Sequence, residues 1–387
     1  MPFAARQKQW PNRLLRRDPP ANPEIQWKVK ETSMQAPATD EVLIRREGRA
    51  GRITMNRPQA LNALTLGMVR QIWDALRAWR NDSAIALVLL DGAGGRALCA
   101  GGDVRSLYDS RAQGSGQART FWREEYRLDA LIGSYPKPLV AIQDGIVMGG
   151  GIGLSGHARD RIVTERSKLA MPETGIGLIP DVGGTWLLAH APGEVGVYLG
   201  LTGETMQAAD AIYAQFADVL VPSASLDRLL ARLVDAKGGP VGRAISAVSE
   251  DPGPAPLAAR RADIDRAFGG ATVEAMLDAL SAMPGEWAQK TLAALAQKSP
   301  KSMKLTLAAI RNAKGLASLE AALNVEFRLC TRLFEDGEFL EGVRALIVDK
   351  DRTPKWSPAR LADVGANLVA AYLAPLPSDE ELGLKPR

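Results

Sequence analysis

The chain has 387 residues, of which 46% are hydrophobic and 24% are charged, and its formal net charge is +4. This composition is typical of a soluble globular protein with a substantial core, and no apolar run reaches the ~18 residues that a membrane span needs. The two cysteines, Cys99 and Cys330, exclude a disulfide framework or a cysteine-based metal cluster and favour a reducing compartment.

The excess basic charge lies at the N-terminus, where residues 1–33 hold seven basic and three acidic side chains. The rest of the chain is balanced, so it lacks the basic face of a nucleic-acid binder, and we expect no nucleic-acid partner. Several prolines and the missing hydrophobic period predict a disordered basic extension over residues 1–38. Its first 17 residues carry five basic groups and no acid, which loosely fits a mitochondrial presequence, but they contain no Ser and no evident amphipathic helix. We therefore expect a cytoplasmic protein, or a protein of the mitochondrial matrix if the source is eukaryotic.

From residue 41 onward the pattern predicts an α/β domain over residues 39–235. Residues 41–46 and 51–57 predict two short strands joined by a Gly-containing turn. Apolar residues at helical spacing over 65–79 predict a helix with Thr65 as its N-cap. Three continuous apolar runs predict strands that are buried on both faces: 85–92, 139–145 and 160–165.

Dense Gly and Pro over residues 235–256 predict a linker or loop. Beyond it apolar residues recur at helical spacing, so we expect a helical C-terminal region over 236–387. Five segments in that region predict helices: 262–268, 272–283, 286–298, 301–313 and 318–336. The sequence contains no evident internal repeat.

Two glycine clusters, at 92–97 and 151–156, match the loose dinucleotide-binding pattern after a strand. Neither precedes the full crossover helix that this fingerprint requires, so we expect no nicotinamide cofactor. In CAGGD at 99–103 and MGGGIG at 148–153, the backbone can approach a ligand closely. If MGGGIG opens a short helix and the two loops face one point, their amide groups could form an oxyanion hole for an acyl carbonyl. The alternative is tight strand–helix packing.

The sequence lacks residues that a serine hydrolase or a metal-dependent hydrolase would need. The sequence around Ser155 lacks the last Gly of a nucleophile elbow, and only His157 and His190 could serve as its base. No His or Cys spacing fits a metal site, so we expect neither a metal nor a cofactor. Acyl chemistry in this chain would therefore depend on carboxylates.

Two carboxylates, Glu173 and Asp181, stand in the otherwise apolar stretch AMPETGIGLIPDVGG at 170–184. Pro172 favours the end of a strand before it, which places Glu173 at a strand exit. The apolar neighbours argue against a surface carboxylate, and a half-dry carboxylate has a raised pKa and can act as base or nucleophile. Asp181 precedes VGG and an apolar run, so helix capping is an alternative explanation for it.

NRPQALNAL, CAGGDV, MGGGIGL and AMPETGIGLIPDVGG resemble, in order and spacing, the enoyl-CoA hydratase/isomerase (crotonase) superfamily. The likeness covers about residues 41 to 365 and is greatest for the hydrolase branch, typified by 3-hydroxyisobutyryl-CoA hydrolase. That branch also has a REEY segment like residues 123–126 and a C-terminal string like residues 341–358. The resemblance implies an α/β crotonase (ClpP-like) spiral of ββα units with a helical C-terminal region.

The resemblance also implies a CoA thioester substrate, whose carbonyl binds the amides that match Gly102 and Gly150. In the hydrolase branch the positions matching Glu125, Glu173 and Asp181 contact the acyl portion. Four further positions match the family's CoA-binding segments: Ala60, Leu61, Ala100 and Asp103. No membrane partner is expected, and a homo-oligomer is compatible with the sequence.

One departure from the superfamily decides the expected reaction. Hydratases use two glutamates, at the positions matching Gly153 and Glu173, and here the first is absent. We therefore expect hydrolysis of a short 3-hydroxyacyl-CoA, 3-hydroxyisobutyryl-CoA of valine breakdown, in which Glu173 attacks the thioester or activates water. Asp181, and with it Glu125, would bind the 3-hydroxyl. Two alternatives stay open: isomerisation or hydration of an enoyl-CoA, and a non-catalytic RNA-binding relative.

Overall fold

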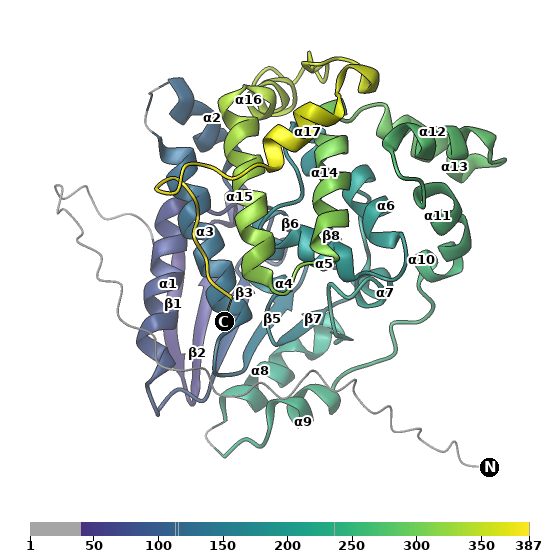
Figure 1. Cartoon of the computed structure of the whole chain (residues 1–387). Coiled ribbons are helices and arrows are strands. Elements are labelled where there is room, and N and C mark those ends of the chain that lie inside the picture. The colour runs from purple at the N-terminus through teal and green to yellow at the C-terminus, as the bar shows by residue number, and fades with distance from the viewer. Residues whose placement is uncertain (1–39, 113, 115, 236, 387) are drawn as a thin grey trace, which may run out of the picture. The chain divides into compact units, whose positions relative to one another are not determined.

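The computed structural model describes residues 40–386 except 113, 115 and 236. The described residues belong to one compact unit (Figure 1). The predicted basic extension over residues 1–38 lies outside them, and the predicted division near residue 235 stays a prediction. No helix in the described ranges is long and apolar enough to cross a membrane.

The strands form a six-stranded sheet, β1-β2-β3-β5-β7-β9, and a three-stranded sheet, β4-β6-β8. Only β1 and β2 pair antiparallel, which confirms the predicted first two strands; the other neighbours are parallel. The strand bounds are as follows: β1 Val42–Glu47, β2 Ala50–Met55, β3 Leu87–Gly92, β4 Ala97–Cys99, β5 Leu139–Gln143, β6 Ile146–Met148, β7 Asp160–Val163, β8 Lys168–Ala170 and β9 Val219–Leu220.

In the first ββα unit, β1 and β2 both join the six-stranded sheet. In each of the three units that follow, the first strand joins the six-stranded sheet, the second joins the three-stranded sheet, and helices follow. The helices of the three units are α2 Val104–Ala112 with α3 Gln117–Gly133, then α4 Gly150–Gly156, then α5 Gly184–His190. The ββα architecture that the resemblance implied is confirmed, although no repeat is evident in the sequence.

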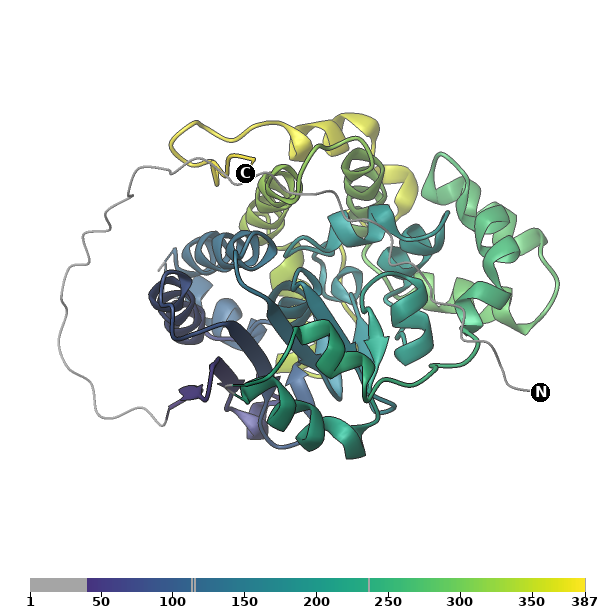
Figure 2. The same ribbon diagram turned by 90° about the horizontal axis from the view of Figure 1, so that it is seen from below.

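The six-stranded sheet has an apolar core on each face. In β3, Val88 and Leu90 join one core, while Leu87 and Leu89 join the other, which confirms a strand buried on both faces. Helices α8 (Leu226–Val234) and α9 (Val241–Ser246) cover the second face (Figure 2). The prediction of a linker over 235–256 was therefore wrong in part. Pro240 stands at the start of α9, and burial of Val241 and Ile245 stabilises a helix that the local Gly and Pro content conceals.

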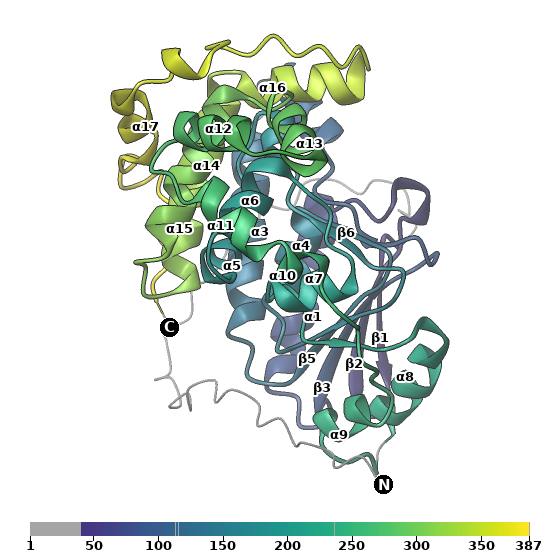
Figure 3. The same ribbon diagram turned by 90° about the vertical axis from the view of Figure 1, so that its right-hand side faces the viewer.

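The first long helix, α1 (Leu66–Arg80), begins as predicted, because Thr65 Oγ1 accepts a hydrogen bond from Met68 N at 3.2 Å. The five helices predicted in the second half are confirmed, and α14 and α15 pack against α5 and α3 (Figure 3). The remaining helices are α6 Val195–Thr202, α7 Ala208–Tyr213, α10 Pro256–Ala259, α11 Arg261–Phe268, α12 Val273–Ala282, α13 Glu286–Leu295, α14 Pro300–Ala313, α15 Leu319–Glu335, α16 Glu338–Val343 and α17 Ala366–Leu373.

Candidate active site

Two glycine loops meet at the N-terminus of α4. Gly150 is the first residue of α4, and a Cβ added to it would lie only 3.3 Å from the amide N of Gly102. We find no acceptor for either amide among the hydrogen bonds of the described residues. Gly149, which precedes Gly150, has a φ of 47°, a conformation that favours glycine. Two neighbouring free amide donors are the arrangement that an oxyanion hole requires.

Glu173 lies beside these loops. It follows β8 and opens the 3-10 helix Glu173–Ile176, so the expected position at a strand exit is confirmed. Its Oε1 would lie 3.0 Å from a Cβ added to Gly149, the side chain is only 4% exposed, and Oε2 has no partner among the described residues. Burial raises the pKa of Glu173 well above its usual value, and the nearby Asp181 raises it further. The carboxyl group is thus a strong base or nucleophile once it is ionised.

Glu125 approaches the same point from α3. Its Oε1 would lie 2.6 Å from a Cβ added to Gly150, so the carboxyl group stands directly over the start of α4. The residue is 2% exposed, and burial together with the charge of Asp181 raises its pKa well above the usual range. The structure therefore brings Glu125, Glu173 and the two amides together around one small volume.

Asp181 is held by a tyrosine that the sequence did not single out on its own. Tyr126 Oη donates a hydrogen bond to Asp181 Oδ2 at 2.6 Å, and the Tyr126 ring packs edge-on against Phe327 at a centroid distance of 6.2 Å. Burial raises the pKa of Asp181 to about 6, although the hydrogen bond from Tyr126 opposes the shift. The alternative that Asp181 caps a helix is wrong, because the N-cap of α5 is Gly183 and the Asp181 side chain accepts no hydrogen bond from the first turn of that helix.

The side chain that binds the start of α5 is Glu326, which the sequence analysis missed. This residue of α15 is fully buried, and its carboxyl group accepts hydrogen bonds from Gly183 N at 2.7 Å, Thr185 N at 2.9 Å and Thr185 Oγ1. Burial raises its pKa to about 8. A signal was present in the sequence, because Glu326 stands at helical spacing between the apolar residues Leu323 and Cys330 in the helix predicted over 318–336. Glu326 thus fixes the turn that follows Asp181.

Glu326→Gln is expected to lower the free energy of unfolding by about 1–3 kcal/mol, because the Gln amide would turn a donor toward a backbone donor. The matched control is Glu320→Gln on the same helix, since no hydrogen bond to the Glu320 side chain occurs within the described part of the chain. Thermal melting of both variants checks this prediction. Equal melting temperatures for the two variants would contradict it.

The residues that match CoA-binding segments lie in two loops that bond to each other. Ala60 ends a short 3-10 helix, and Leu61 follows with a left-handed φ of 49°. The Leu61 carbonyl accepts a hydrogen bond from Ala100 N at 3.1 Å, and the Leu64 carbonyl accepts one from Asp103 N at 2.9 Å. The two loops therefore form one half-buried surface leading to the glycine loops; their role in CoA binding stays a prediction.

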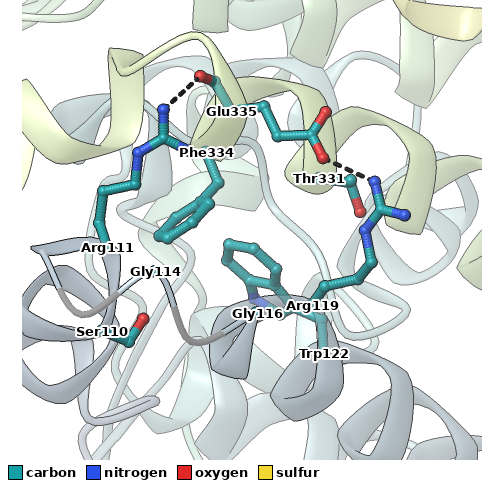
Figure 4. A pocket seen from close by; sticks show the side chains of 9 residues that line it. All are labelled: Ser110, Arg111, Gly114, Gly116, Arg119, Trp122, Thr331, Phe334 and Glu335. Carbon is teal, nitrogen blue, oxygen red and sulfur yellow. Dashed lines mark hydrogen bonds and ion pairs between the residues drawn. The ribbon is translucent and has the colours of Figure 1, made fainter.

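Two cavities of the structure lie away from this cluster. One of about 280 Å³ opens between α2, α3 and α15 (Figure 4). In it Arg111 donates to the Glu335 carbonyl at 3.3 Å and Arg119 pairs with the Glu335 carboxylate at 2.6 Å, beside the rings of Trp122 and Phe334. A second cavity of about 670 Å³ lies among α11, α12 and α13. Neither is lined by the glycines or the carboxyl groups of the candidate site, so neither is taken as the reaction centre.

Comparison with known proteins gives consistent relatives. The family model for enoyl-CoA hydratase/isomerase matches residues 50–373. The 3-hydroxyisobutyryl-CoA hydrolase of Danio rerio, named as mitochondrial, is 40% identical over 344 residues, covering 87% of this chain and 90% of that protein. The Homo sapiens protein of the same name is 39% identical over 341 residues, covering 86% of this chain and 88% of its own length.

Two solved structures are similar to almost the whole described chain. A carnitinyl-CoA dehydratase from Mycobacterium thermoresistibile has a TM-score of 0.85 and 45% identity, covering 89% of this chain and 98% of its own. An enoyl-CoA hydratase from Rhodobacter sphaeroides has a TM-score of 0.83 and 43% identity, covering 89% of this chain and 100% of its own.

Proposed function

Because this chain belongs to the enoyl-CoA hydratase/isomerase family, we propose that it is an acyl-CoA thioester hydrolase that converts 3-hydroxyisobutyryl-CoA to 3-hydroxyisobutyrate and CoA. One observation carries the chemistry: the buried Glu173 carboxyl group lies beside the free amides of Gly102 and Gly150. A base or nucleophile next to an oxyanion hole is the minimal machinery for acyl transfer to water. The choice of 3-hydroxyisobutyryl-CoA as the substrate rests on the names of the two similar hydrolases.

In the proposed reaction the thioester carbonyl oxygen accepts hydrogen bonds from Gly102 N and Gly150 N. Ionised Glu173 then attacks the carbonyl carbon, the C–S bond breaks, and the CoA thiolate leaves and takes up a proton. Water cleaves the resulting mixed anhydride and regenerates the carboxylate. In the alternative route Glu173 removes a proton from water, which attacks the thioester directly. Both routes need the same ionised carboxylate at the same place.

Recognition of the acyl group is assigned to Asp181, with Glu125 beside it. A buried carboxylate that already accepts one hydrogen bond from Tyr126 can still accept one from a substrate hydroxyl. A substrate without that hydroxyl would leave the buried acceptor unpaired, which costs binding and rate. Asp181 thereby favours a 3-hydroxyacyl group over the plain acyl group.

Hydration or dehydration is the second candidate, favoured by the names of the two similar solved structures. Addition of water across a double bond needs an acid and a base on the two sides of that bond. Gly153 on α4 supplies neither, so hydrolysis is the better-supported reaction. An RNA-binding role has no support from the relatives, whose names describe enzymes.

Release of free thiol from a panel of CoA esters tests the proposal. We expect release from 3-hydroxyisobutyryl-CoA to exceed release from isobutyryl-CoA by about a hundredfold or more, because polar groups built for a hydroxyl discriminate strongly. The matching enoyl-CoA should neither release thiol nor gain water at a comparable rate. Fast loss of the enoyl absorbance without free thiol would identify a hydratase instead.

We propose that the protein works in the cytoplasm, or in the mitochondrial matrix if the source is eukaryotic. Cys99 and Cys330 are both buried free thiols, which suits a reducing environment. The Danio rerio relative is named as mitochondrial, which supports the second compartment for a eukaryotic source. Assembly of several copies stays a prediction.

A further inference from the structure

The helices α3 and α4 pack together, and two acids of α3 face two glycines of α4 in step. Glu125 Oε1 would lie 2.6 Å from a Cβ added to Gly150, and Asp129 Oδ1 would lie 2.8 Å from a Cβ added to Gly153. Asp129 follows Glu125 by one helical turn, and Gly153 follows Gly150 by nearly one turn. The Asp129 carboxyl group therefore fills the space into which a side chain at position 153 would project.

Among the residues that the structure describes, Asp129 has no hydrogen-bond partner that would explain its burial. It is 0% exposed, and neither carboxyl oxygen has a hydrogen-bond partner among the described residues. Leaving a buried carboxyl group unpaired is costly, and most buried polar atoms in folded proteins find partners. An unpaired buried acid next to a reaction centre points to a group that arrives with the substrate.

The surroundings of Asp129 favour its neutral form. Burial raises its pKa well above the usual range, and the charges of Glu125, Asp181 and Glu326 raise it further. A protonated carboxyl group offers one donor and spare acceptor capacity, which matches a hydroxyl group. Asp181 lies near enough for its charge to act on the Asp129 carboxyl group, and its chain neighbour Val182 packs against the same glycine, with its Cβ 2.8 Å from a Cβ added to Gly153.

We propose that Asp129 is a further specificity residue, whose carboxyl group holds the 3-hydroxyl of the bound acyl group together with Asp181. This inference rests on the proposed hydrolase function. The spacing allows it: three residues of an α-helix rise ~4.5 Å, so Asp129, at the level of Gly153, lies about one helical turn from the Gly150 amide that would hold the carbonyl. Asp129 also occupies the space that the side chain of an acid at position 153 of α4 would need.

The test compares Asp129→Leu and Asp129→Asn with Asp160→Asn. Asp160 at the start of β7 is an acid whose burial also raises its pKa, and it is not part of the site, so it is the matched control. We measure equilibrium affinity and kcat/KM for 3-hydroxyisobutyryl-CoA and isobutyryl-CoA. Asp129→Leu should lower the preference for the hydroxylated ester at least about tenfold, Asp129→Asn should lower it less, and Asp160→Asn should not change it.

A second pair of variants covers the case in which Asp129→Leu does not fold. Gly153→Ala would press on Asp129 and on Val182, whereas Gly156→Ala on the same helix would press on Leu187 and Ile152 instead. Only the first should reduce the hydroxyl preference.

An unchanged preference in Asp129→Leu, or equal effects in Gly153→Ala and Gly156→Ala, would overturn the proposal while leaving the hydrolase function in place. If the wild type binds both esters equally and releases thiol from neither, the hydrolase function itself fails and this inference with it. If the wild type adds water to an enoyl-CoA and Asp129→Leu abolishes that reaction, Asp129 is instead the second acid of a hydratase.

Discussion

Glu173→Gln is expected to reduce thiol release from 3-hydroxyisobutyryl-CoA by about 10³-fold or more, because the proposed base or nucleophile at the oxyanion hole is lost. Gln keeps the size of the side chain, so the glycine loops around it should stay in place. The CoA ester should therefore still bind with an affinity close to that of the wild type. Single-turnover thiol release and equilibrium binding, measured on the same preparation, separate these two effects.

The pH profile of the wild type is the control for this assignment. Glu173 acts as an anion, so kcat/KM should fall as the pH drops and the carboxyl group becomes protonated. Because burial and Asp181 raise its pKa, this fall should begin at a higher pH than an ordinary glutamate would give. Near wild-type release by Glu173→Gln would show that another group performs the attack.

Asp181→Asn is expected to lower kcat/KM for the 3-hydroxyacyl ester by about tenfold to a hundredfold, since losing a charged acceptor costs roughly 1.5–3 kcal/mol. Turnover of isobutyryl-CoA should change much less, so the preference for the hydroxylated ester shrinks. The melting temperature should change little, because the Asn carbonyl can still accept the hydrogen bond from Tyr126. Kinetics with both esters and a melting curve check the three expectations together.

The same preference should also respond to pH in the wild type. Burial places the pKa of Asp181 at about 6, so acidification through that value protonates the acceptor and should weaken the preference. The Asn variant should lack this response. An equal preference in variant and wild type would show that the hydroxyl is read elsewhere, and Glu125 and Asp129 would be the residues to change next.

The local sequence was sufficient to predict a strand, a loop or a buried acid where the residues that determine the feature lie within that segment. The apolar run of β3 predicts a strand buried on both faces, and its alternate residues do enter two cores. The glycines around Gly102 and Gly150 predict a close backbone approach, because only a missing Cβ permits it. Glu173 stood out in the sequence as an acid at the end of a strand among apolar residues, where a buried carboxyl group is costly without a function or a partner.

Tertiary structure alone decided what each acid does. Two distant residues decide whether Asp181 caps a helix or faces the site. Tyr126, 55 residues earlier in the chain, donates a hydrogen bond to Asp181. Glu326, 141 residues from Thr185, accepts the hydrogen bond from the backbone at the start of α5. Asp129 reads in the sequence as one more polar residue of an amphipathic helix, and only the packing of α3 on α4 buries it against Gly153. Short-range patterns indicate the backbone preference and which face of an element is apolar. The pKa and the partners of a carboxyl group depend instead on the distant groups that packing brings around it.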